Sequence, residues 1–442
     1  MKRSYLIFSA LLVLPLLMVL PLAAQAQDNA QPEPYAPGEG ISLTGKNNYN
    51  IRLSGILQPM VETRSYPEMS EQAATQRFRM RRIITKLTGS AANEKIRYQL
   101  QVDLTGSSDG GGDAGTNNYL MDAWISYRPV KQVEFTFGQE TSPTDGREMG
   151  MLSNGLQMIE RSPVALAFAS IREFGVIVET KFKLGKGMAL HPTLSVSNGD
   201  GANVGRKDHG GLKVGGRLDF LPFGTFSNGG QYTQVDMERE LTPKLVIGIT
   251  GSHNQGISDR RGRESGSILY LDSLGQESLP SYTKVGADLL FKYKGFSLLA
   301  EYVNATASVP TDITQRVRND GTTSAAFLVN GIQDVNAFVK GRIMLGSGYN
   351  VQAGYLFLNG YGIDGRYARL MPASNSFLTN PTFYNRSEFF TLCASKYLGR
   401  HFGAKIQASV TYTKAEAGSR TVLDTPQRGN EVSGLLMLTI AL

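Results

Sequence analysis

The sequence predicts an all-β protein that forms a transmembrane antiparallel β-barrel. Three observations point to this class. Apolar and polar residues alternate along many segments of about ten residues, the length of a membrane-crossing strand. Short and long connections alternate between these segments, as in outer-membrane barrels. Beyond the N-terminal leader, no segment approaches the roughly 18 consecutive apolar residues that a membrane-spanning helix needs.

The leader has the features of a Sec signal peptide. Lys2 and Arg3 precede an apolar run that ends at small residues, including Ala24 and Ala26. Two prolines interrupt the run, which argues against a transmembrane helix. We therefore expect export and cleavage after Ala26, with no lipid anchor because the residue directly after the cleavage point is Gln27 and not a cysteine.

The mature chain is expected to have two parts. Residues 27–48, rich in Pro and Gly, read as a flexible periplasmic lead-in that is too short and polar to plug a wide channel. Residues 49–442 are expected to form the barrel. The single cysteine, Cys393, excludes an internal disulfide and a thiolate metal cluster. The formal charge of the full chain, +7, is mild and attracts anions without selecting one.

The clearest strand pair lies in residues 283–304. Apolar side chains occupy alternate positions on both sides of Lys294 and Gly295, and a two-residue turn there sets Tyr293 opposite Phe296. The other face carries Lys284, Asp288, Lys292, Ser297 and Glu301. In a barrel, this polar face lines a wet lumen. Side chains cannot fill the interior of a barrel of about sixteen strands, so the pattern predicts a channel.

The same alternation supplies the remaining strands. They are expected at residues 51–61, 77–87, 95–104, 119–127, 133–137, 174–178, 188–196, 212–220, 245–249, 335–345, 349–357, 387–396, 404–412 and 432–442. Residues 335–345 and 349–357 should pair across a turn at 346–348, and residues 359–384 should be a long external loop. Residues 223–241 lie where a short turn is due, and either a small hairpin or a periplasmic excursion would account for them.

Four segments carry a resemblance to a known family: FRMRRIITKLTG (78–89), GRLDFLPFGTF (216–226), RELTPKLVIGITGS (239–252) and DLLFKYKGFSLLAEY (288–302). From about Tyr49 onward the chain resembles the phosphate-selective porin O and P family of outer-membrane porins, in a form typical of Bacteroidota. The resemblance implies a sixteen-stranded barrel, usually a homotrimer, with an inward-folded third external loop and a basic lumen that favours anions. The chain departs from the family at its last residue, Leu442, where an aromatic residue is expected.

The acidic residues of the predicted lumen argue against strict selectivity for phosphate. They include Asp122, Glu134, Asp288 and Glu301. We therefore expect a passive channel for small hydrophilic solutes with a mild preference for anions, and selectivity for phosphate or polyphosphate stays open. The expected partners are outer-membrane lipids, permeating anions and the assembly machinery during biogenesis, without a cofactor or nucleic acid.

Candidate pore residues cluster in the second strand. Arg77, Arg79 and Arg81 alternate with Phe78 and Met80, so the guanidinium groups project to one side. If the apolar residues face lipid, these arginines face the pore, where a guanidinium suits an oxyanion. A basic cluster binding lipid phosphate at the interface is the other interpretation. Arg82 breaks the alternation, which indicates a bulge or the headgroup layer. Lys95, Arg97 and Arg128 extend the basic wall.

The loop at residues 140–171 is too apolar to remain in water. It combines flexible Gly and Pro positions with many residues that need burial. We expect it to fold into the barrel mouth, and capping the outside or packing on a neighbouring subunit are the alternatives. Its candidate charged rim consists of Asp145, Arg147, Glu160, Arg161 and Arg172.

Other function classes find less support. The four histidines are scattered, and no phosphate loop or hydrolase motif is present, which disfavours a barrel enzyme. A plug domain that would indicate an energised transporter is not evident. A non-transporting barrel that serves as a structural, receptor or secretion-linked component remains the alternative. Trp124 falls on the lumen side, where it either packs beneath the inward loop or offers a solute a stacking surface.

Overall fold

A computed structural model describes residues 31–32, 38–45, 49–69, 71, 74–105, 119–170, 172–202, 209–258, 269–318, 320–381, 385–399 and 402–442. The predicted signal peptide, residues 1–26, lies outside these ranges. Among the described residues, no helix is both long and apolar enough to span a bilayer.

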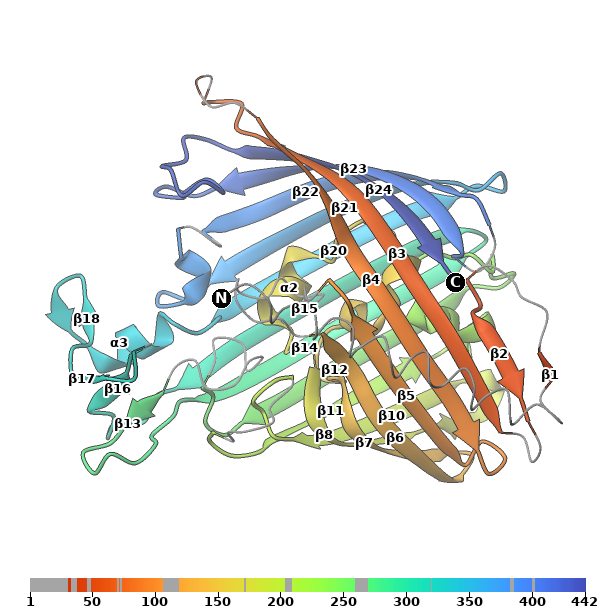
Figure 1. Ribbon diagram of the computed structural model, residues 1–442, viewed down its shortest axis with the longest axis horizontal. Coiled ribbons are helices and arrows are strands. Elements are labelled where there is room, and N and C mark those ends of the chain that lie inside the picture. The colour runs from red at the N-terminus through yellow and green to blue at the C-terminus, as the bar shows by residue number, and fades with distance from the viewer. Residues whose placement is uncertain are drawn as a thin grey trace, which may run out of the picture.

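The main sheet closes into a barrel of 16 antiparallel strands, as predicted (Figure 1). The strands are β3 (Asn50–Ser65), β4 (Thr75–Ala91), β5 (Ile96–Asp103), β6 (Leu120–Val130), β7 (Val133–Thr141), β8 (Arg172–Thr180), β10 (Ala189–Ser197), β11 (Lys213–Leu221), β12 (Lys244–Asn254), β14 (Ser281–Tyr293), β15 (Phe296–Ser308), β20 (Gly346–Leu356), β21 (Tyr361–Pro372), β22 (Arg386–Tyr397), β23 (Ala404–Ala415) and β24 (Glu431–Ala441). Each strand pairs with the next, and β24 pairs with β3. Closure leaves no barrel strand with an unpaired edge facing lipid.

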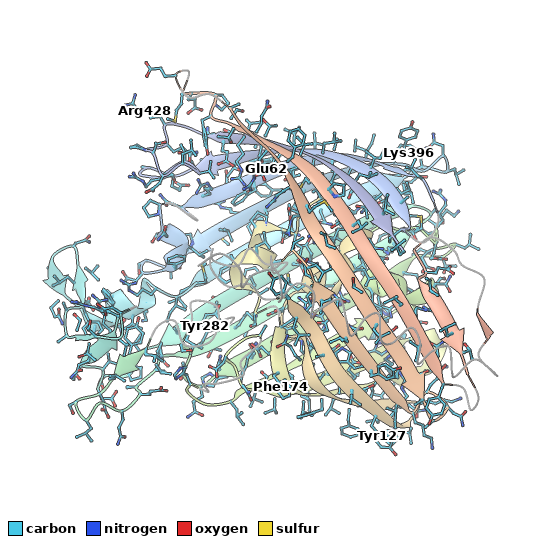
Figure 2. All side chains as sticks on the ribbon, in the orientation of Figure 1. Glu62, Tyr127, Phe174, Tyr282, Lys396 and Arg428 are labelled. Carbon is cyan, nitrogen blue, oxygen red and sulfur yellow. The ribbon has the colours of Figure 1, made fainter. Side chains whose placement is uncertain are left out.

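The residue pattern is that of a membrane barrel, with apolar side chains outside and polar ones inside. Large outward residues such as Ile125, Leu194 and Leu392 are 62%, 65% and 66% exposed, although they are apolar. Tyr127 and Phe174 also lie on the outer surface (Figure 2). The hairpin register predicted for residues 283–304 is confirmed, with Tyr293 opposite Phe296. Lys284, Asp288, Lys292, Ser297 and Glu301 share the inner face and are buried there.

One predicted strand is wrong and one strand was missed. Residues 335–345 form no strand, because α3 (Val335–Lys340) begins there behind Asp334, whose carboxylate accepts a hydrogen bond from Ala337 N at 2.9 Å. The predicted turn at 346–348 is instead the start of β20. The predicted long loop at 359–384 contains β21, which is interrupted by small and charged residues on its outward face.

The external end of the barrel carries short elements in the long loops. β13 (Tyr270–Leu271), β16 (Gln315–Val317) and β17 (Thr323–Ser324) form a small sheet, and β18 (Leu328–Val329) pairs with β19 (Ile332–Gln333). A 3₁₀ turn, η6 (Phe377–Thr379), follows β21. These loops share a hydrophobic core with the inward loop described below.

At the opposite end, part of the predicted lead-in joins the barrel wall. β2 (Ile41–Thr44) pairs with β3 from Ile41↔Leu53 to Thr44↔Asn50, and β1 (Gln31–Pro32) pairs with β2. The last strand, β24, occupies the same edge of β3 further along, from Ile56 to Ser65. β2 and β24 therefore share one edge of β3. On the same side of the membrane, β9 (Phe182–Lys183) and η4 (Gly185–Gly187) connect β8 to β10.

Candidate functional site

The loop between β7 and β8, described over residues 142–170, folds into the barrel. This is the third external loop, and its inward fold is the one predicted. It contains η2 (Arg147–Gly150), η3 (Ser153–Gly155) and α2 (Pro163–Phe168), which lies inside the barrel in Figure 1. Ser162 caps α2 by accepting a hydrogen bond from Ala165 N at 3.1 Å, and Pro163 occupies the first helical position.

Apolar contacts hold this inward loop against one side of the barrel. Met151 and Leu156 pack in a buried cluster with Val246, Leu290 and Leu299. The last three project inward from β12, β14 and β15, and each is at most 1% exposed. Apolar side chains are unusual on the inner face of a wet barrel. Here they form the surface on which the loop packs.

Ion pairs fix the start of the loop. Asp145 pairs with Lys284 of β14. Arg147 donates from Nη2 to Asp219 Oδ1 at 2.6 Å and from Nε to Asp288 Oδ1 at 2.8 Å. Burial by itself would raise the pKa of Asp145, but the ammonium groups of Lys284 and Lys213 outweigh it and lower that pKa below its ordinary value.

Glu148 connects the loop to the far wall. Its carboxylate accepts hydrogen bonds from Arg366 Nη2 of β21 at 2.7 Å, Ser162 N at 2.7 Å and Gln234 Nε2 at 2.9 Å. The side chain is fully buried. Removing Arg366 would leave an uncompensated charge in the interior, so this contact is a structural anchor.

Glu160 connects the loop to β4. It accepts hydrogen bonds from Arg81 Nε at 2.5 Å and Nη2 at 2.7 Å, a bidentate pair, and lies 3.5 Å from Arg79 Nη2. Burial tends to raise the pKa of Glu160, but the guanidinium groups of Arg81, Arg82 and Arg79 together lower it.

A β-bulge allows two consecutive arginines to reach the interior. The register slips between Gln58 and Pro59, so that Gln58 pairs with Arg82 while Pro59 pairs with Met80. Pro59 cannot donate a ladder hydrogen bond, which favours the irregularity. Arg81 and Arg82 are consequently both buried, and Arg82 Nη1 donates to Gln58 Oε1 at 2.7 Å. Of the two interpretations offered for Arg82, a bulge or the headgroup layer, the structure shows the bulge.

A second segment enters the barrel from the opposite end. Residues 222–243, between β11 and β12, contain η5 (Ser227–Tyr232) and meet the inward loop. We call residues 222–243 the periplasmic segment. Leu152 N donates to Tyr232 O at 3.1 Å, and Gln234 N donates to Gly155 O at 3.0 Å. The structure therefore gives a third outcome for 223–241, since this segment is an inward fold that supports the loop.

Lys292 anchors the periplasmic segment. Its Nζ donates to Gly230 O at 2.8 Å, Val235 O at 2.9 Å and Thr233 Oγ1 at 3.0 Å. The side chain is 1% exposed. Three acceptors satisfy the three donors of the ammonium group, which makes its burial tolerable.

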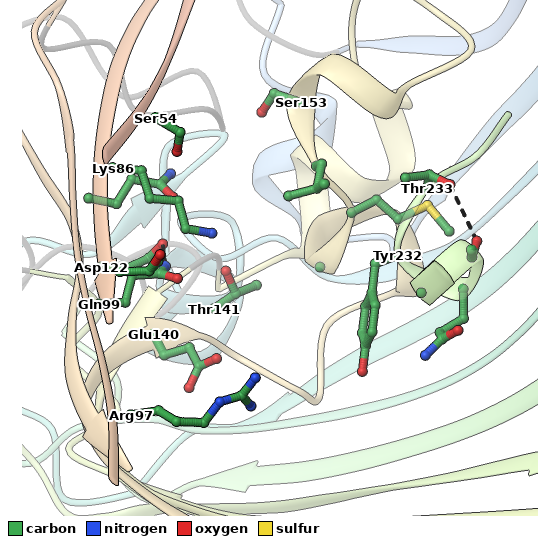
Figure 3. A pocket seen from close by; sticks show the side chains of 18 of the residues that line it. Ser54, Lys86, Arg97, Gln99, Asp122, Glu140, Thr141, Ser153, Tyr232 and Thr233 are labelled. Carbon is green, nitrogen blue, oxygen red and sulfur yellow. Dashed lines mark hydrogen bonds between the residues drawn. The ribbon is translucent and has the colours of Figure 1, made fainter. Parts of the chain in front are cut away.

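The two inward segments leave a cavity of about 1490 Å³ on one side of the lumen. Its wall comes mainly from the inner faces of β3 to β8, β10 and β11, and the loop and periplasmic segment form the other side. In Figure 3, Arg97 and Glu140 lie on the wall and Tyr232 lies across from them. Basic and acidic side chains line the cavity in similar numbers.

The predicted basic wall divides into two groups. Arg97 and Arg128 line the cavity, where Glu134 lies 3.6 Å and 2.6 Å from them. Arg77, Arg79 and Arg81 project inward, opposite the outward Phe78 and Met80, but they are not part of the cavity wall. Glu62 lies 2.7 Å from Arg77 and 3.5 Å from Arg79. Lys95 is exposed in the turn between β4 and β5.

Most of the charged residues predicted for the loop rim are bonded to other residues of the protein. Asp145, Arg147, Arg161 and Arg172 border the cavity, whereas Glu160 does not. Arg161 donates to Glu148 O and to Met151 O within the loop. Arg172 Nε pairs with Asp122 Oδ1 at 2.7 Å.

Sequence reasoning did not single out several charged residues of the cavity. These are Arg52, Lys86, Glu140, Glu179, Lys181, Arg217 and Asp219. The period-two alternation places all of them except Lys181, which follows β8, on an inner face, and this was an available signal. The signal does not show which inner-face positions the inward segments cover. Within the described ranges, no group of three or more His, Cys, Asp or Glu residues is placed to hold a metal ion.

Comparisons with known proteins agree with this architecture. The family model for phosphate-selective porin O and P matches residues 63–325, more than half of the chain. The anion-selective porin from Comamonas acidovorans aligns over 89% of this chain and 100% of its own, with a TM-score of 0.50 and 10% identity. The trimer form of OmpT from Vibrio cholerae covers 89% and 99%, with a TM-score of 0.47 and 9% identity. No curated protein sequence matches the chain.

Proposed function

The chain belongs to the phosphate-selective porin O and P family, and on that premise we propose that this outer-membrane porin is a passive channel with a mild preference for anions. The observation that carries the proposal is the distribution of charge in the cavity. Asp122, Glu134 and Asp219 are held by arginines, whereas Lys86 forms no ion pair among the described residues. Lys86 and Arg97, which is 44% exposed, therefore offer positive charge to a passing solute.

Strict selectivity for phosphate receives less support. Such selectivity needs several guanidinium or ammonium groups directed at one oxyanion. Arg77, Arg79 and Arg81 of β4 are each within ion-pair distance of Glu62 or Glu160. Glu140 and Glu179 add two further carboxyl groups to the cavity wall. We therefore propose a general channel for small hydrophilic solutes, in which phosphate is one permeant among other anions.

Planar-bilayer recording of the purified protein tests this proposal. Under a salt gradient, we expect steady conductance and a reversal potential displaced toward anion permeation. The double variant Lys86→Gln/Arg97→Gln should move the reversal potential toward zero. Arg77→Gln, a charge loss outside the cavity, is the matched control and should move it less. A silent bilayer would favour the non-transporting barrel, and unchanged selectivity in the double variant would contradict the assigned residues.

The precursor and the assembly complete the proposal. We propose that residues 1–26 direct export and are removed after Ala26, and that the mature protein is a homotrimer. N-terminal sequencing of the protein from outer membranes should begin at Gln27. The mass of the detergent complex, corrected for bound detergent, should be about three times that of the mature chain.

A further inference from the structure

Trp124 is the one tryptophan in the 442-residue chain, and it lies on the inner face of β6, where it lines the cavity. Tryptophan in membrane barrels normally belongs to the aromatic belts at the lipid interface. The neighbouring Ile125 follows the rule, because it points outward and is 62% exposed. The position of Trp124 therefore calls for a role inside the lumen.

The indole ring presents carbon surface to the cavity. Its Nε1 is buried and has no hydrogen-bond partner among the described residues. The residue as a whole is partly exposed and borders the cavity. Since the nitrogen is covered, the exposed part of the ring is apolar. The inward loop does not cover it completely, which separates Trp124 from the buried apolar residues that receive the loop.

The wall beside the ring carries no side chains. Gly138 is paired directly with Trp124 on β7, and Gly175 is paired with Gly138 on β8. A Cβ at Gly138 would lie 2.6 Å from Trp124 Cα, and a Cβ at Gly175 would lie 2.6 Å from Ser197 Cα. Both positions are therefore restricted to glycine. Neither glycine borders the cavity itself, so the apolar shelf that faces a solute is the exposed face of the indole.

Polar groups that donate and accept hydrogen bonds surround this shelf. Gln99 is paired with Trp124 on the other side, while Arg97, Thr136 and Glu140 occupy adjacent inner-face positions of β5 and β7. Figure 3 shows Arg97, Gln99 and Glu140 on this wall. Amide, guanidinium, hydroxyl and carboxylate groups supply both donors and acceptors.

We propose that the wall around Trp124 is a binding site for neutral pyranose sugars. The C–H face of a pyranose ring packs on an indole. The sugar hydroxyls, which lie at the edge of the pyranose ring, donate hydrogen bonds to planar polar groups and accept hydrogen bonds from them. The shelf and its rim provide both kinds of contact. This inference rests on the channel but not on its anion preference, because sugars form a second class of solute.

Intrinsic fluorescence tests the site directly, because Trp124 is the only indole. Titration of the detergent-solubilised protein with maltose or glucose should give a saturable change in intensity or emission maximum. Glycerol, which has hydroxyls but no ring, should give no saturable change at matched concentrations. Absence of a saturable response to either sugar would overturn the proposal, as would an equal response to glycerol.

Sugar block of ionic current supplies the second measurement. Maltose should reduce the current of the wild-type channel saturably, and Trp124→Ala should weaken the block by about tenfold. Trp124→Phe keeps an aromatic face and should retain most of the block. An unchanged block in Trp124→Ala would refute the site. Neither substitution should change the reversal potential recorded on the same channels under a salt gradient. The anion preference is therefore tested independently of the sugar site.

Discussion

At the bulge in β4, one extra residue changes what the strand can do. A regular strand would send Arg81 inward and Arg82 outward into lipid, where a charge is costly. The slip between Gln58 and Pro59 turns both side chains inward. Arg81 forms the bidentate pair with Glu160, and Arg82 Nη2 lies 3.8 Å from the same carboxylate. The bulge therefore places two cations at one anchor of the inward loop.

We predict that Glu160→Gln loosens this anchor. The change leaves Arg81 and Arg82 without their carboxylate, and we expect a loss of about 2 to 3 kcal/mol in the free energy of unfolding, since Glu160 is only partly exposed. Conductance should become larger and noisier. Thermal unfolding and single-channel recording measure the two effects. Asp424→Asn, at the exposed pair with Arg420, is the control and should change stability little.

Asp145 and Glu160, the carboxylates that tie the loop to the barrel wall, determine how the loop responds to acid. The pKa values of Asp145 and Glu160 are both lowered by neighbouring cations, in spite of burial. Their stabilisation is therefore complete above the ordinary carboxylate pKa of about 4, and it is lost only as pH falls through the lower folded values. We predict steady conductance down to about pH 4 and increased fluctuation below it. Loop release between pH 5 and 7 would contradict this assignment.

At the scale of elements, the inward loop and the periplasmic segment form one unit. Backbone hydrogen bonds join them at Leu152 and Gln234, and Gln352 Nε2 of β20 donates to both Gln157 Oε1 and Gln234 Oε1 at 2.8 Å. Asp236 completes the unit by accepting a hydrogen bond from Gly295 N at 2.7 Å. The narrow part of the channel is therefore built from both ends of the barrel.

We predict that Lys292→Met releases the periplasmic segment while the barrel still forms. The substitution removes three hydrogen bonds to the segment but none from the backbone pairing of β14 with its neighbours. Single-channel conductance should rise. The protein should still migrate differently on electrophoresis before and after heating, which shows that the barrel is folded. Lys244→Met is a matched control, because Lys244 is paired directly with Lys292 but its hydrogen bond to the periplasmic segment, to Phe223 O at 3.1 Å, is exposed to solvent. Equal effects of the two substitutions would count against the anchoring role.

The limits of sequence reasoning follow from the same elements. Alternation predicted the 283–304 hairpin because its outward residues are uniformly apolar. It failed at β21, where Gly365 and Arg369 share the outward face with Tyr361 and Ile363. The alternation in residues 335–345 was fortuitous, and the helix cap at Asp334 was the better signal. Arg77 pairs with Glu62, which lies opposite it on β3. The partner of Arg81 is Glu160, whose position depends on the path of a loop far away in sequence, which no local pattern contains.

At the scale of the whole molecule, the closure between β24 and β3 has two components. β24 covers β3 from Ile56 outward, and β2 covers it from Asn50 to Leu53. Arg52 Nε also donates to Ser42 Oγ at 2.8 Å. The chain thus completes its cylinder with strands from both of its termini.

We predict that deletion of residues 38–45 leaves a folded barrel of lower stability. The deletion exposes the backbone of β3 at its periplasmic end and should cost about 2 kcal/mol, which lowers the thermal midpoint. Ser42→Ala removes only the hydrogen bond with Arg52 and should cost less. Thermal unfolding followed by circular dichroism measures both variants. An unchanged midpoint after the deletion would show that β2 contributes nothing to closure.

Because the cavity lies on one side of the lumen, the two halves of the chain have different roles. The wall that solutes meet comes from strands in the first half of the chain, whereas the later strands mainly provide backing, through residues such as Arg366 and Lys405, whose Nζ donates to Leu156 O at 2.9 Å. Inner-face substitutions before about residue 220 should change which molecules pass. Inner-face substitutions after residue 220 should instead change how firmly the inward loop and the periplasmic segment are held. A screen for altered permeation and a screen for leaky channels should therefore recover mutations in different halves of the gene.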